Sequence, residues 1–163
     1  MTSPSWAQRL GATALVAGAL FAVGGCGTDY DGTEARAAEQ ARETARAVEK
    51  TLTEVVLVAD PPTGQLLVDA VRQNVPDSYG RIQIFDLSQL DEDEVSLKVA
   101  FDGSAESGGG GTYYQFLARL CVEYRVRSGA DPGVTVEDTR CSPELLEPTG
   151  PTQKADRTIG LED

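Results

Sequence analysis

Three cysteines and the absence of histidine limit the chemistry that this 163-residue chain can carry. Without histidine, a Ser-His-Asp arrangement and histidine ligands for a metal are excluded. Cys121 and Cys141 lie near each other in the sequence, whereas Cys26 stands alone far upstream. Because the chain has no C-x-x-C motif, the pair is expected to form a structural disulfide rather than a redox centre.

The two later cysteines lie on the flanks of a candidate hairpin. Residues 112–127 alternate between apolar and polar side chains, which is the period of a strand with one buried face. Residues 134–141 form a second, shorter strand after the turn-rich segment SGADPG. A symmetric hairpin centred at Asp131 opposes three pairs, which are Cys121 and Cys141, Arg125 and Glu137, and Val126 and Val136. Opposed residues of antiparallel strands lie within reach of a disulfide, so we predict a cross-strand bridge.

Cationic side chains gather on the polar face of the strand 112–127. With Lys98 of the preceding strand, they define a candidate binding face of Tyr113, Arg119, Arg125, Arg127 and Lys98. Guanidinium groups bind carboxylates through two parallel hydrogen bonds, so this face is suited to an acidic peptide, a carbohydrate acid or the edge of a partner. The alternative is a water-facing sheet whose arginines are balanced by Glu123 and Glu137.

The rest of the chain is strongly acidic, with 26 Asp and Glu against 14 Lys and Arg. A net charge of -12 disfavours nucleic acid as a partner, because phosphate binding needs clustered cations. The acidic runs at 29–34 and 91–94 lack the spacing of a calcium-binding EF-hand loop, so we predict neither a metal nor a cofactor. No motif singles out a catalytic pair of carboxylates, and we expect a protein that is not an enzyme.

The amino-terminal residues have the organisation of an export signal. A polar segment with Arg9 precedes residues 10–23, fourteen residues without charge. This run suits the core of a signal peptide and is shorter than the roughly 20 residues of a membrane-spanning helix.

The residues Val23, Gly24, Gly25 and Cys26 follow at once, and they resemble the lipobox of bacterial lipoprotein precursors. The resemblance implies that a diacylglycerol is attached to the sulfur of Cys26 and that a signal peptidase removes residues 1–25. It places the protein on the extracytoplasmic side of the cell membrane, where disulfides persist. Residues 26–33 are then a short acidic tether.

The remaining pattern predicts the elements that position these residues. A long helix runs from Asp31 or Thr33 to Ala59, with an apolar stripe that is thin in its first half. Its spacing also fits a coiled-coil dimer, but alanines make a weak zipper, so we expect packing on a sheet and a monomer. A short helix at 63–75 and strands at 81–87, 94–102, 112–127 and 134–141 follow, with a flexible loop at 103–111.

These elements predict one α+β domain over residues 34–141, with a loosely ordered tail at 142–163. The order of elements is similar to that of cystatin-like or NTF2-like rolls, an analogy that carries no function. We expect a non-enzymatic binding or assembly module of the cell envelope. The alternatives are a lipoprotein that binds a small ligand in a cavity under Val48, Leu52 and Val55, and a carboxylate-dependent hydrolase.

Overall fold

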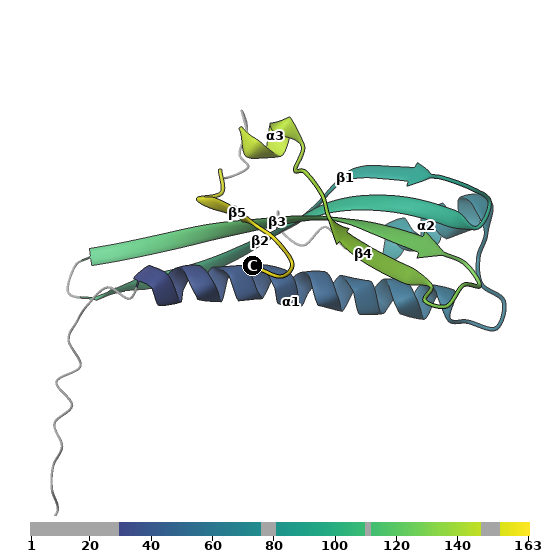
Figure 1. The fold of residues 1–163 in the computed structure, drawn as a ribbon, viewed down its shortest axis with the longest axis horizontal. Coiled ribbons are helices and arrows are strands. Elements are labelled where there is room, and N and C mark those ends of the chain that lie inside the picture. The colour runs from purple at the N-terminus through teal and green to yellow at the C-terminus, as the bar shows by residue number, and fades with distance from the viewer. Residues whose placement is uncertain (1–29, 76–80, 110–111, 148–153) are drawn as a thin grey trace, which may run out of the picture.

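The computed structural model describes residues 30–75, 81–109, 112–147 and 154–163, and it confirms the predicted α+β fold. The elements in chain order are α1 (Tyr30–Val56), α2 (Gly64–Asn74), β1 (Ile82–Gln89), β2 (Glu94–Gly109), β3 (Thr112–Arg127), β4 (Val134–Asp138), α3 (Pro143–Leu146) and β5 (Arg157–Ile159). Strands β1 to β4 form an antiparallel meander in sequence order, and β5 pairs in parallel with β3. Helix α1 runs along one face of this sheet (Figure 1).

The predicted apolar stripe of α1 is buried against the sheet, but its details differ at the end. Small side chains occupy the first half of the stripe and larger ones the second: Ala37, Ala38, Ala41 and Ala45, then Val48, Leu52 and Val56. The helix ends at Val56 rather than Ala59, because the ring of Pro61 would clash with the carbonyl of Leu57 in a continued helix. Ala59 is therefore exposed.

Helix and sheet approach each other closely where β2 contains Gly103. A Cβ atom added to this glycine would lie 2.0 Å from the backbone oxygen of Ala37. Glycine within a strand often marks such a close approach of two backbones. The predicted flexible loop at 103–111 is therefore wrong for its described part, because β2 continues to Gly109 and pairs with β3 as far as Thr112.

The predicted disulfide between Cys121 and Cys141 is present, with the two Cα atoms 5.3 Å apart, but the predicted strand register is wrong. Val126 pairs with Val134, so the hairpin is shifted by two residues from the symmetric arrangement. The residue opposite Cys121 is Thr139, whose N–H donates to the carbonyl of Cys121 at 3.0 Å. Cys141 lies beyond the end of β4 and reaches back over the outer face of the sheet.

The tail was expected to be loosely ordered and to lie outside the domain, and this is wrong for its described residues. Leu145 of α3 packs on the disulfide in a small second core on the outer face of the sheet. Ile159 of β5 is buried in the main core. The sequence has few apolar residues here, but these two are placed where the sheet still has uncovered apolar surface. Residues 148–153 lie outside the described part of the chain.

Candidate functional site

Arg119, at the centre of the candidate binding face, is buried and bonded within the protein. Its Nε and Nη2 atoms donate to the two carboxylate oxygens of Asp102, at 2.6 and 2.5 Å. Its Nη1 atom donates to the carbonyl oxygen of Leu145 in α3. The side chain is 0% exposed, so the prediction that Arg119 faces a partner is wrong. The reason is that the tail folds over it.

The other cations of this face each lie beside a carboxylate. The pairs are Lys98 with Asp86 (3.0 Å), Arg125 with Glu123 (3.6 Å) and Arg127 with Glu94 (2.5 Å). The pKa of Arg127 is raised, chiefly by the hydrogen bond that it donates to Glu94. Such partly exposed pairs contribute little to stability, but they cancel the positive charge of the face. The alternative of a water-facing, balanced sheet describes these residues better than a basic patch.

Tyr113 lies at the other end of β3 from Arg125 and Arg127. Twelve residues of strand separate Tyr113 from Arg125, which corresponds to about 40 Å. The Tyr113 side chain is exposed, and a hydrogen bond to Glu106 raises its pKa. The five predicted residues therefore do not form one site.

Two of these ion pairs could have been predicted from the sequence if the register of β2 and β3 had been recognised. Asp102 pairs with Arg119 and Glu94 with Arg127, so oppositely charged residues face each other across the two strands. Folding the sequence about the glycine run 108–111 gives this register directly. The expectation of a loop that began at residue 103 concealed it.

The interface between α1 and the sheet is filled near the start, the middle and the end of the helix. At its start, the backbone of Gly103 meets that of Ala37, as described above. In the middle, the Tyr124 hydroxyl donates to the carbonyl of Ala45 at 2.8 Å, and its ring packs edge-on against Phe101 with centroids 6.3 Å apart.

At the end of the helix, a Cβ on Gly133 would lie 2.6 Å from a methyl group of Val56. Of the three residues under which a ligand cavity was expected, Val48 and Leu52 are buried in the core and Val55 is partly buried against it. A cavity that runs along the helix is therefore interrupted at all three places.

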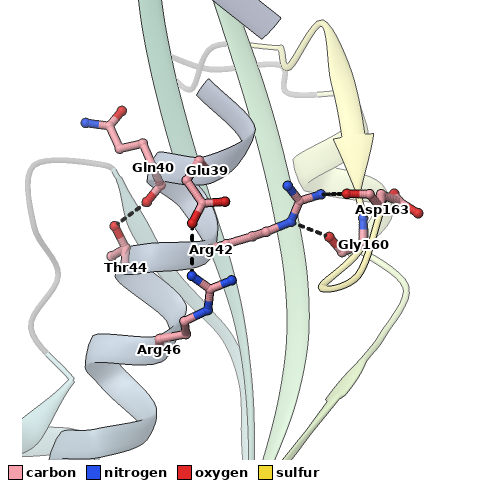
Figure 2. Close-up of polar contacts among 7 residues, drawn as sticks. All are labelled: Glu39, Gln40, Arg42, Thr44, Arg46, Gly160 and Asp163. Carbon is pink, nitrogen blue, oxygen red and sulfur yellow. Dashed lines mark hydrogen bonds and ion pairs between the residues drawn. The ribbon is translucent and has the colours of Figure 1, made fainter. Parts of the chain in front are cut away.

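The carboxyl-terminal residues 154–163 are called the strap. Its strand β5 pairs with β3, and Gly160 and Asp163 after it contact the polar side of α1 (Figure 2). Arg42 donates from Nε to the carbonyl of Gly160 (3.0 Å) and from Nη2 to the carbonyl of Asp163 (2.9 Å). Arg157 of β5 pairs with Glu34 of α1. An open groove of about 520 Å³ lies between strap and helix. Both arginines that line the groove are bound across it, and their contacts hold the strap to α1.

A different surface collects exposed apolar side chains at the end of the domain where α1 finishes. This surface, called the tip, consists of residues 57–63, 89–93 and 128–133 with the first turn of α2, and these segments lie together in Figure 1. The N–H of Gly64 donates to the backbone carbonyl of Glu92 (2.6 Å), and the N–H of Ser128 donates to the backbone carbonyl of Asp93 (2.8 Å). The exposed side chains are Leu57 (68%), Val58 (50%), Leu66 (70%) and Leu90 (51%). Sequence analysis missed them, although apolar residues beside turns were a visible signal.

No family model matches the sequence, and no curated protein matches it. One solved structure, the intermembrane space region of the chloroplast protein ARC6, aligns with 68% of this chain and 93% of its own. Its identity is 12% and its TM-score is 0.20, so it carries no argument about this protein. Among the described residues, no cluster of metal-ligating side chains and no helix apolar enough to span a membrane occurs.

Proposed function

We propose that this chain is a bacterial lipoprotein whose folded domain is a non-enzymatic, protein-binding module of the cell envelope. The anchor is proposed from the lipobox, with diacylglycerol on Cys26, which lies outside the described residues. Helix α1 begins at Tyr30, four residues later, and four residues span at most about 14 Å. The start of α1 is then held close to the membrane.

The observation that supports protein binding over binding of a small ligand is the filled interface between α1 and the sheet. A ligand-binding pocket is a cavity of about 300 Å³ or more that buries most of its ligand. The Tyr124 hydroxyl at Ala45 and the backbone of Gly133 at the Val56 side chain flank the space where such a cavity was expected, and Val48 and Leu52 between them are buried in the core. We therefore expect binding to take place on the exterior of the domain, which has exposed apolar side chains at the tip.

The lipid anchor is tested by metabolic labelling with an alkyne fatty acid. The wild-type protein and the matched control Thr28→Ala should carry the label, and Cys26→Ser should not. The protein extracted from membranes should also lack tryptophan emission, because Trp6, its single tryptophan, belongs to the removed segment. Label on Cys26→Ser, or tryptophan emission from the extracted protein, would contradict the assignment.

The binding class is tested by crosslinking intact membranes with an amine-reactive reagent and identifying the products by mass spectrometry. We expect one envelope protein to be linked to the wild-type chain. The alternative of a ligand-binding lipoprotein predicts no protein product and a small molecule that stays bound in native mass spectrometry.

A further inference from the structure

We propose that the tip is a docking surface for a segment of a partner protein in which apolar side chains are flanked by lysine or arginine. This inference rests on the proposed function and adds to it the place and chemistry of the contact. It is carried by three observations, which are the exposure of the apolar side chains, the charge around them and their distance from the anchored end.

Packing within the domain does not explain the apolar side chains of the tip. Leu66 is 70% exposed, whereas its neighbours Leu67 and Val68 fill the core face of α2. Leu57 and Val58 directly follow the last residue of α1, Val56. Leu90 occupies the β1–β2 turn, where polar residues and glycine are usual. Large apolar side chains that gather in this way on a water-exposed surface mark interaction sites.

The charged side chains within the tip are all of one sign. The exposed carboxylates of the tip are Asp60, Asp91, Glu92, Asp93 and Asp131. The three segments of the tip and the first turn of α2 contain no lysine or arginine. Arg125 and Arg127, which line a hollow together with Pro132 of the tip, lie beside Glu123 and Glu94. An apolar centre with a negative rim is complementary to an apolar segment with cationic flanks.

The same charge disfavours two other occupants. Two copies of the tip that met face to face would bring like charges together, which opposes self-association. Anionic lipid would be repelled for the same reason. Position agrees with this, because the 27 residues of α1 place the tip about 40 Å from the end of the helix that follows the proposed anchor. A lipid anchor at the start of α1 would therefore leave the tip at the opposite end of the helix, where it can reach a partner protein.

The experiment treats intact membranes that contain the full-length lipoprotein with a carbodiimide, which joins carboxylates to lysine amines at zero length. Wild type is compared with Leu57→Ser/Leu66→Ser and with the matched control Leu146→Ser, which changes an exposed leucine of α3 (44%). A second comparison sets Asp91→Asn/Glu92→Gln/Asp93→Asn against Glu43→Gln/Glu144→Gln/Glu147→Gln, which removes the same charge from other exposed positions. Urea unfolding of each variant verifies that the domain still folds.

We expect wild-type crosslinks from tip carboxylates to lysines of one protein. The double serine variant should lower their yield about tenfold or more, because two leucines lose their burial in the interface. Leu146→Ser and the control charge variant should leave the yield unchanged. If a partner is captured but its crosslinks start elsewhere, or survive both tip variants, the tip inference fails and the proposed function stands. Crosslinks between two copies of this chain also refute the inference. If neither this reagent nor the amine-reactive one captures a protein, both proposals fail.

Discussion

Replacement of Gly103 by alanine tests the packing of α1 on the sheet, on which the argument against a ligand cavity depends. The added Cβ would lie 2.0 Å from the Ala37 oxygen and 2.8 Å from the Ala41 nitrogen. Ordinary contact begins near 3.4 Å, so α1 must move away by about 1.4 Å. Overpacking costs 1–3 kcal/mol and occasionally more, and here the clash is with rigid backbone. We expect Gly103→Ala to lower the free energy of unfolding by about 3 kcal/mol or more.

The assay is urea unfolding of the mature protein, followed by far-ultraviolet circular dichroism. Ser104→Ala is the matched control and should change the free energy of unfolding by less than about 0.5 kcal/mol. Adding Ala37→Gly to Gly103→Ala should not restore stability, because the clashing atom of Ala37 belongs to its backbone. A Gly103→Ala protein as stable as the control would refute the reasoning, since α1 could not then lie this close to β2.

Three further predictions concern groups that the structure buries. Asp102→Asn should lower the free energy of unfolding by about 3–5 kcal/mol, because it removes the carboxylate charge that is bound to the buried Arg119 guanidinium. Asp102→Leu/Arg119→Met should be more stable than Asp102→Asn when both are compared by urea unfolding. Reduction of the Cys121–Cys141 disulfide, which joins residues 20 apart, should cost about 3 kcal/mol in urea unfolding with and without reductant. Burial raises the pKa of Tyr124 above the usual value of about 10. The stability that its neutral form provides is therefore present below pH 10 and is lost as the pH rises further. In Tyr124→Phe, the free energy of unfolding should fall less steeply than in the wild type between pH 9 and pH 11.

Local periodicity was enough to predict α1, α2 and the positions of strands β1 to β4. The stripe of α1 and the alternation in β3 each depend on one buried face, and both are confirmed. The disulfide was also predictable, because Cys121 and Cys141 flank a turn. The register of the β3–β4 hairpin was not predictable from the disulfide. Cys141 lies two residues beyond the position opposite Cys121, and a disulfide tolerates that offset.

Periodicity failed where long-range contacts decide the structure. Glycines 103, 108 and 109 read locally as a loop, yet Gly103 is required by a helix more than sixty positions earlier in the chain. Leu145 and Ile159 are two of the few large apolar residues in a polar tail, and their burial depends on the sheet surfaces that they cover. The same tail buries Arg119. The alternation of strand β3 alone could not show this, so Arg119 was wrongly predicted to be exposed for binding.

The most direct measurement of the proposed function is native mass spectrometry of the protein released from membranes in mild detergent. We predict the mass of a chain that begins at a diacylated Cys26, in complex with one other protein and without a small molecule. A chain that retains residues 1–25, or a chain alone with a stoichiometric small molecule, would contradict the proposal of a lipid-anchored, protein-binding module.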